Sequence, residues 1–242
     1  MSTLIILTAA LLPVMLLLSY IYKKDPQPEP TPQLVRAVLW GMTICLPVAL
    51  LEEFIQTLLL DAGLDPSTLF GATIEAFTVA AVPEEAFKLL VLWFVLRKNP
   101  YFDEHFDGIV YAVSVGLGFA ALENIAYVLG DENWLSVAIL RALLSVPGHY
   151  AFAVLMGYYY SIYHFVDRSP KVAACILLAP VVAHGIYDAI AFSGAVNPYI
   201  GGLSFFILIW FCVKMHKKAR KKVMALIDKD KDLYNSGYNK TY

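Results

Sequence analysis

The chain has 242 residues, of which 59% are hydrophobic and 16% are charged, and its mean hydropathy is +0.63. Soluble domains carry about 25% charged residues, so this composition excludes an ordinary soluble protein and indicates one that crosses a lipid bilayer several times. The net charge is −2, and half of the 18 basic residues lie from Lys214 onward. That asymmetry concerns orientation in the membrane and does not indicate a nucleic-acid partner.

Seven apolar stretches are each long enough to cross a bilayer, which takes about 20 apolar residues. They cover residues 3–22, 34–60, 69–97, 108–130, 134–166, 171–194 and 198–215. We therefore predict an all-α, polytopic membrane helical bundle with about seven transmembrane helices. Residues 1–222 form a single transmembrane domain in this prediction, and residues 223–242 form a polar cytoplasmic tail.

The connections between the stretches alternate in charge. Basic residues follow the first, third, fifth and seventh stretches, whereas the other connections are acidic or uncharged. The positive-inside rule then predicts an N-terminus outside the cell and a C-terminus in the cytoplasm. The first stretch lacks a basic region before it and runs directly into Lys23, so we expect no cleavable signal peptide.

Two adjacent carboxylates and an ammonium group lie near the middle of the third stretch. Glu84, Glu85 and Lys88 share one arc of a helix, and Pro83 before them loosens the backbone. Each such charge costs about 2.5–3.5 kcal/mol on insertion scales, so ionisable residues at this depth are candidates for function. An ion pair that only holds helices together is the simpler alternative, but one lysine neutralises one carboxylate and leaves the other.

Further polar side chains occupy the fourth, fifth and sixth stretches, from the middle of the membrane outward. Glu123 lies in the fourth stretch. His184 and Asp188 are four residues apart in the sixth, so Asp188 can orient the imidazole. His149 follows a Pro-Gly pair in the fifth, where a structural role at a helix kink competes with a functional one. This distribution predicts a water-filled cavity open to the outer face.

Other charged residues receive supporting roles. Arg141 is expected to neutralise Glu75, Glu123 or Asp188. Glu75 is half a turn round the helix from the glutamate pair, so we expect it to face a different neighbour. Glu52, with Glu53 beside it, can line the mouth of the cavity or pair with a neighbouring helix, and for both we favour the structural role.

Carboxylates and a histidine in a wet pocket inside a bilayer suit the hydrolysis of a peptide bond. A carboxylate can take a proton from water, which then attacks the carbonyl carbon, and His184 can donate a hydrogen bond to the oxyanion. The sequence has neither a Gly-x-Ser-x-Gly nor a His-Glu-x-x-His motif, so serine chemistry and the usual zinc signature are unsupported. A metal site formed by Glu123, His149 and His184 stays open as an alternative.

Two other functions use the same kinds of residue. A proton- or ion-coupled transporter also carries Glu, His and Asp inside the membrane. Against it, the sequence shows no inverted repeat, and the acids gather toward one side of the membrane. A non-catalytic sensor or immunity protein would bind a peptide in the pocket without cutting it.

Three motifs in this order resemble those of the PrsW family of intramembrane proteases. They are Glu84-Glu85-x-x-Lys88, Phe119-x-x-x-Glu123 continued by Asn124 and Tyr127, and His184-x-x-x-Asp188. That family is similar to a wider group with the CAAX prenyl endopeptidases and bacteriocin-immunity-type proteases. The resemblance covers about residues 35–215 and makes residues 1–222 a protease domain.

The resemblance implies a substrate and a location. The substrate is a single-span membrane protein, such as an anti-sigma factor cut near the outer face at the start of a stress response. The location is the bacterial cytoplasmic membrane, where the protein is multi-pass. The partners are then this substrate and the lipid bilayer.

The resemblance also implies a role for each catalytic residue. Glu84 is the water-activating base, with Glu85 beside it. Glu123 stands where the prenyl-endopeptidase branch has a histidine, and it helps to hold the water. His184 and Asp188 bind the oxyanion, and Asp188 stands where that branch has an asparagine.

Four further residues and the cofactor complete the prediction. Lys88, Asn124, Tyr127 and His149 support the site. The wider group has been described both as metal-dependent and as glutamate-dependent. We expect a glutamate mechanism without a cofactor, because the sequence has no standard metal-ligand spacing; a divalent metal such as zinc is the alternative.

Overall fold

The computed structural model describes residues 3–235, and these residues form helices and short connections with no strand. In chain order the α-helices are α1 (Thr3–Tyr22), α2 (Thr31–Thr43), α3 (Cys45–Asp61), α4 (Leu69–Glu75), α5 (Val82–Leu96), α6 (Asp107–Gly130), α7 (Trp134–Leu140), α8 (Val146–Phe165), α9 (Pro170–Val196) and α10 (Pro198–Asn235). Two π-helical turns, η1 (Ala76–Ala81) and η2 (Arg141–Ser145), join α4 to α5 and α7 to α8.

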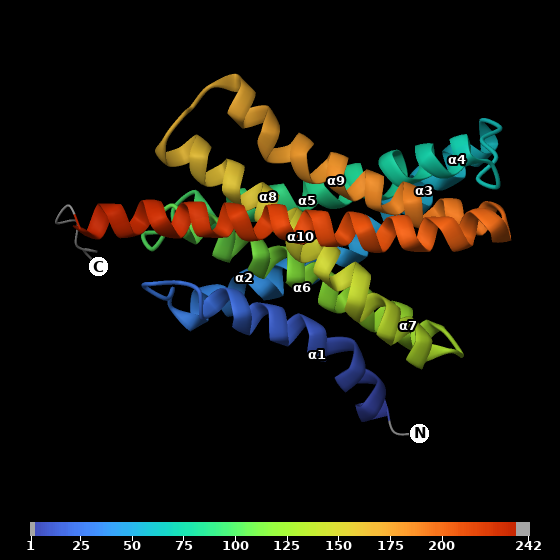
Figure 1. Ribbon diagram of the computed structural model, residues 1–242, viewed down its shortest axis with the longest axis horizontal. Coiled ribbons are helices and arrows are strands. Elements are labelled where there is room, and N and C mark those ends of the chain that lie inside the picture. Colours follow the sequence, from blue (N-terminus) through green and yellow to red (C-terminus); the bar gives the residue numbers. More distant parts are fainter. Residues whose placement is uncertain (1–2, 236–242) are drawn as a thin grey trace.

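The connections gather at two opposite ends of the molecule (Figure 1). The α3–α4, α6–α7 and α9–α10 connections lie at the same end as the start of α1. The α1–α2, α5–α6 and α8–α9 connections lie at the other end, together with the end of α10. The chain therefore runs back and forth along one direction, as a bundle of membrane crossings must.

Among residues 3–235, six helical stretches are long and apolar enough to cross a membrane. They are Thr3–Tyr22, Thr31–Asp61, Asp107–Gly130, Trp134–Phe165, Pro170–Val196 and Tyr199–Asp232. The stretch from Leu69 to Leu96 is also helical throughout, but it carries the glutamate pair and further charges. The predicted all-α polytopic membrane bundle is confirmed. The total of about seven crossings and the outside N-terminus stay predictions.

Helix α6 is the centre of the bundle, and α1, α2, α5 and α8 pack around it. Small residues let the neighbouring backbones come close, as is typical of helix contacts in membranes. A Cβ atom on Gly118 would collide with the Val38 carbonyl oxygen of α2, and one on Gly116 would meet the Ala153 side chain of α8 at 2.8 Å. The tight packing fixes the rotation of α6, which carries Glu123.

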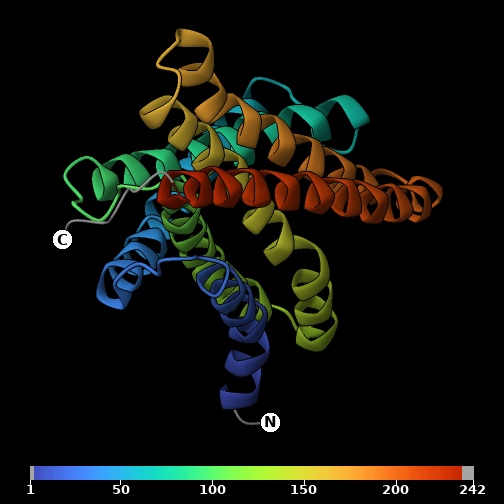
Figure 2. The same cartoon turned by 60° about the vertical axis from the view of Figure 1, so that its left-hand side comes forward.

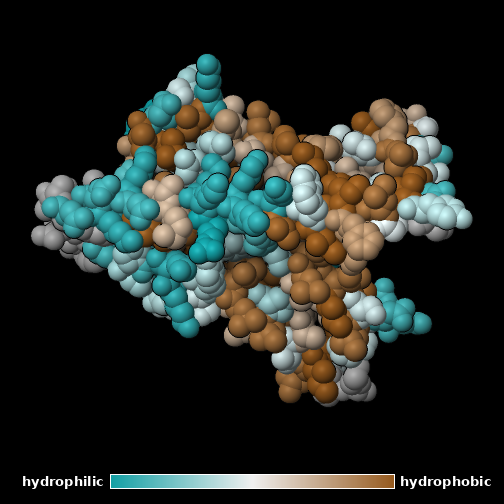
Figure 3. Space-filling view, in the orientation of Figure 1, coloured by the Kyte–Doolittle hydropathy of each residue, from teal (hydrophilic) through white to brown (hydrophobic). Residues whose placement is uncertain are grey.

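Helix α10 continues past the last apolar stretch. Its exposed basic residues form the hydrophilic area in the middle of Figure 3, whereas α7 and the end of α9 present apolar surface. Beyond residue 222, Val223, Leu226 and Ile227 are buried in the same cluster as Ile109 of α6. The predicted domain boundary at residue 222 thus falls inside a helix, and residues 236–242 of the predicted tail lie outside the described residues.

Candidate active site

Two helices that carry polar residues begin with the same backbone feature. The π-helical turn η1 runs into Val82-Pro83 at the start of α5, and η2 runs into Val146-Pro147 at the start of α8. Proline has no N–H group, so a carbonyl of the preceding turn loses its donor and the helix can widen. Glu84 and Glu85 follow the first proline and His149 follows the second, and all three are buried.

Lys88 binds both members of the glutamate pair. Its Nζ lies 2.7 Å from Oε2 of Glu84 and 2.8 Å from Oε1 of Glu85. The ammonium group also lies 4.4 Å from the centre of the Phe119 ring. The predicted clustering of these three charges on one arc of the helix is confirmed. Because one ammonium faces two carboxylates, a second cationic or donor group is needed to satisfy them.

His184 of α9 provides that second contact. Its Nδ1 lies 3.0 Å from Oε1 of Glu85, and its Nε2 lies 3.0 Å from Oδ2 of Asp188. The Phe152 ring stacks on the imidazole with centroids 4.6 Å apart and an interplanar angle of 18°. Both nitrogen contacts are hydrogen bonds when both nitrogens carry a proton. The predicted orientation of His184 by Asp188 is present in this geometry.

His149 of α8 lies between the two groups of acids. Its Nε2 is 2.8 Å from Oε2 of Glu123, and its Nδ1 is 3.3 Å from Nζ of Lys88. A carboxylate only accepts, so the proton belongs on Nε2, and Nδ1 is then left as an acceptor that faces the ammonium group. His149, for which a kink role competed, is thus placed at the centre of the polar cluster.

Arg141 extends the cluster toward helix α1. One of its terminal nitrogens lies 2.8 Å from Oε2 of Glu123, and its Nε donates to Oδ1 of Asn124 at 2.6 Å. The guanidinium carbon lies 4.2 Å from the centre of the Tyr127 ring. Asn124 in turn donates from Nδ2 to the Ala10 carbonyl oxygen at 2.6 Å. Of the three partners considered for Arg141, the structure selects Glu123.

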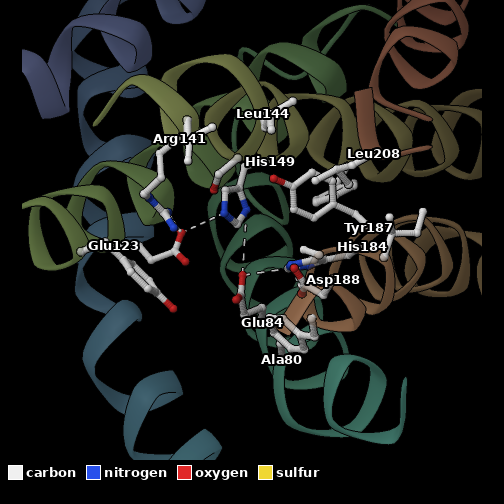
Figure 4. A pocket seen from close by; sticks show the side chains of 18 of the residues that line it. Ala80, Glu84, Glu123, Arg141, Leu144, His149, His184, Tyr187, Asp188 and Leu208 are labelled. Carbon is white, nitrogen blue, oxygen red and sulfur yellow. Dashed lines mark hydrogen bonds and ion pairs between the residues drawn. The ribbon is translucent and has the colours of Figure 1, made fainter. Parts of the chain in front are cut away.

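These side chains surround a cavity of about 580 Å³, a size typical of ligand sites. Figure 4 shows Glu84, Glu123 and the two imidazoles directed toward one another across it. Asp188 lies beside His184 at the wall of the cavity. The cavity therefore presents carboxylates and imidazoles from four helices to one small volume.

A family model described as PrsW family intramembrane metalloprotease matches residues 29–215. The Protease PrsW of Geobacillus kaustophilus is 36% identical over 217 residues, which cover 89% of this chain and 92% of the relative. Those of Oceanobacillus iheyensis and Bacillus subtilis are 36% and 34% identical, and each alignment covers 92% of this chain and 99% of the relative. No solved structure matches.

The chain belongs to the PrsW family of intramembrane proteases. The matched residues run from the end of the α1–α2 connection into α10, so they include every helix that contributes a catalytic candidate. Family membership and the six apolar helical stretches make this a multi-pass protein of the bacterial membrane. A hydrolase is thereby favoured over the ion-coupled transporter.

The family description raises the question of which residues of this PrsW protein can hold a metal. Glu84, His149 and His184 each offer one donor atom, and the three atoms lie within 4.8 Å of one another. Two imidazoles, a carboxylate and an open side are a donor set of the kind that catalytic zinc uses. Glu123, the carboxylate of the metal set predicted from sequence, is bonded instead to the outward nitrogen of His149. The Lys88 ammonium lies against the same Glu84 oxygen that would bind the metal.

The structure brings the five predicted catalytic residues together, either directly or through Lys88 and His149. Glu85 and Lys88 do not line the cavity but contact residues that do. Asn124 lies behind Arg141, whereas Tyr127 reaches the cavity wall. Of the four supporting residues, Lys88 and Asn124 therefore contact the site through neighbours, whereas Tyr127 and His149 line the cavity.

Two cavity-lining residues received no role at the site from the sequence, since Phe152 was not singled out and a structural role was favoured for Glu52. Phe152 lies on the cavity wall three positions after His149, so helical spacing places it on the same face. Glu52 also lines the cavity, and its Oε1 is buried with no hydrogen-bond partner among residues 3–235. Glu75, as predicted, faces elsewhere, since it accepts a hydrogen bond from Gln56 at 2.7 Å.

Proposed function

We propose that this intramembrane protease hydrolyses a peptide bond in or next to the transmembrane segment of a single-span membrane protein, with Glu84 as the base that activates water. The observation that supports this most directly is the position of Glu84. Its Oε2 lines the cavity and lies 3.9 Å and 4.0 Å from the Nδ1 atoms of His149 and His184. A water molecule in the cavity can therefore contact the carboxylate and an imidazole together.

Glu84 takes a proton from this water, and the water oxygen attacks the carbonyl carbon of the substrate. The same proton then passes from Glu84 to the leaving amine. Glu123 accepts from the N–H of His149 Nε2, so that Nδ1 of His149 faces Glu84 and the Lys88 ammonium at the place where the water binds. Lys88 and Glu85 support Glu84 from behind the cavity wall. Each role uses a contact that already exists in the structure.

His184 donates from Nε2 to the oxyanion that forms on the substrate carbonyl oxygen, and Asp188 positions the ring before that oxyanion forms. Asp188 holds Nε2 of His184 at the cavity wall, and Glu85 holds Nδ1 on the buried side. The oxyanion is negatively charged like Asp188, so it can take over the Nε2 hydrogen bond when Asp188 moves aside. Glu85 keeps the ring in place during this exchange.

A metal would be held by Glu84, His149 and His184, and it would supply an activated water and polarise the carbonyl group. We propose the glutamate mechanism because Lys88 already neutralises the Glu84 oxygen that the metal would need. The ammonium group also lies 3.3 Å from Nδ1 of His149, a second donor of that set. A cation at this place would therefore compete with Lys88.

The resemblance noted from the motifs points to an anti-sigma factor, cut near the outer face, as the substrate. We test this and the protease reaction by quantitative proteomics of membrane fractions from cells that carry either the unsubstituted protein or Glu84→Gln. Single-span proteins should accumulate uncut in the Glu84→Gln cells. Glu53→Gln is the matched control, because Glu53 is exposed on α3 and does not line the cavity. Identical membrane proteomes in all three strains would contradict the proposal.

A further inference from the structure

We propose that the transmembrane segment of the substrate enters the cavity sideways from the lipid, through an opening between α7–η2 and α10. This inference rests on the proposed function, since a buried hydrolytic site needs a route for a membrane-embedded chain. The opening is the part of the cavity wall where two helices face each other without packing together. The side chains on both sides of this opening indicate what kind of segment can occupy it.

Two helix faces form the sides of this opening. Each contributes residues spaced three and four apart, so that one stripe of the helix faces the cavity. The stripes are Leu140, Arg141, Leu144 and Ser145 on α7–η2, and Phe205 and Leu208 on α10, where Gly201 and Ser204 line the cavity but contact α9. In Figure 4, Leu144 and Leu208 lie at the rim of the cavity, above His149 and Tyr187.

The two sides separate toward one end of the molecule. Helix α7 packs on α6 and α1, whereas α10 packs on α8 and α9. Figures 1 and 2, which differ by a rotation of 60°, both show α7 diverging from the first half of α10. Figure 3 shows a notch at the same place, between the start of α7 and the end formed by α9 and α10. Residues of α7, η2 and α10 line the same cavity as the catalytic side chains.

The chemistry of the opening fits an apolar polypeptide segment. Leu140 is 48% exposed and Phe205 is 44% exposed, so both present apolar surface to whatever fills the space. Arg141 is the one charged residue among the described members of the two stripes, and Glu123 and Asn124 already engage it. A charged soluble peptide would find no partner there. The transmembrane segment of a membrane protein would bury its side chains against these residues.

The other sides of the cavity are less suited to such a segment. Gly194 and Gly201 bring α9 and α10 into contact, and Ser193 and Ser204 share a hydrogen bond of 2.7 Å. That side is closed. On the α3 side the wall carries Glu52, whose Oε1 is already buried with no hydrogen-bond partner among residues 3–235, and an apolar helix would offer this carboxyl group none. Of these three sides, formed by described residues, the α7–α10 side is the one that is both open and apolar.

Site-specific photo-crosslinking tests this opening without relying on turnover. The full-length Glu84→Gln protein is placed in phosphatidylglycerol–phosphatidylcholine vesicles with benzoyl-phenylalanine at one position, Leu144, Leu143, Phe205 or Phe206. Leu143 and Phe206 are matched controls, because they are 66% and 70% exposed on the same helices but do not line the cavity. The probe is a biotinylated synthetic peptide with one Leu/Ala transmembrane segment of about 20 residues and a polar outer flank.

We expect crosslinks to the probe from positions 144 and 205 several-fold above those from 143 and 206. Excess unlabelled spanning peptide should suppress them, whereas the polar flank alone should not. Equal crosslinking from the control positions, or crosslinks to lipid in place of the probe, would overturn the proposal.

Cleavage by the unsubstituted protein is measured separately. Crosslinks at 144 and 205 without any cleavage would refute the hydrolytic function but not the opening, and cleavage with crosslinks only at 143 and 206 would refute the opening alone.

Discussion

Glu123 holds His149 by a single short contact, 2.8 Å between Oε2 and Nε2, although the two residues lie on different helices. This contact decides which nitrogen of His149 carries the proton, and so which nitrogen accepts from the Glu84 side. Glu84 itself stays 3.9 Å away from Nδ1, which leaves room for a shared water molecule. The proposed catalytic mechanism depends on this orientation of the His149 imidazole.

Replacing Glu123 by Gln should lower kcat by about 10- to 100-fold, the range measured when a partner that orients a histidine is lost. Gln can still accept from Nε2, but its neutral amide no longer stabilises the proton there or the charge of Arg141. The measurement is the initial rate of substrate cleavage in vesicles. Glu53→Gln serves as the control and should cleave at the normal rate. An unchanged rate for Glu123→Gln would remove it from the site.

Arg141 should not be replaceable by Lys. Its Nε and a terminal nitrogen bind two different acceptors, Asn124 and Glu123, and a lysine ammonium cannot reproduce that planar geometry. We expect Arg141→Lys and Arg141→Gln to lose activity to a similar extent, and Arg141→Gln to add little to Glu123→Gln. Arg168→Lys, at an exposed position of the α8–α9 connection, is the control. Full activity of Arg141→Lys would show that only its charge matters.

Removing Lys88 should destabilise the fold. Lys88→Met leaves two buried carboxylates without their ammonium partner, and breaking a buried charge pair costs about 3–5 kcal/mol. The expected result is a lower midpoint of thermal unfolding in detergent than for the unsubstituted protein. Adding Glu84→Gln to Lys88→Met should recover part of the loss, because it removes one of the orphaned charges. Lys171→Met, on the exposed start of α9, should unfold normally.

Metal removal separates the two mechanisms. The glutamate mechanism predicts that cleavage persists after exhaustive dialysis against a chelator, and that purified protein contains no stoichiometric zinc by elemental mass spectrometry. The metal alternative predicts zinc in the unsubstituted protein and its loss in His149→Ala, because His149 belongs to the donor set. Activity that disappears on chelation and returns with zinc would overturn the assignment of Glu84 as the base.

The local motifs could be predicted from the sequence because helical spacing alone determines them. Glu84 and Lys88, and likewise His184 and Asp188, are four residues apart, so any helix brings each pair together. The apolar stretches around these residues likewise predict their depth in the membrane. These features needed no knowledge of how the helices pack.

Contacts between helices could not be predicted in this way. His184 reaches Glu85, and His149 reaches Glu123, because α8 and α9 adopt particular rotations against α5 and α6. Those rotations depend on close backbone contacts and on the wide turns before Pro83 and Pro147, which a single sequence does not specify. For this reason Glu84 is the carboxylate that lies within about 4 Å of both imidazole Nδ1 atoms, whereas sequence reasoning placed Glu123 in the metal set.

The most direct test of Glu84 as the water-activating base is cleavage in heavy-oxygen water. Purified protein and a single-span protein that accumulates in Glu84→Gln cells are combined in vesicles, and the fragments are analysed by mass spectrometry. The account predicts one heavy oxygen in the new carboxylate from the unsubstituted protein and from Glu53→Gln, and no fragments from Glu84→Gln. Cleavage by Glu84→Gln at the rate of the unsubstituted protein would contradict it.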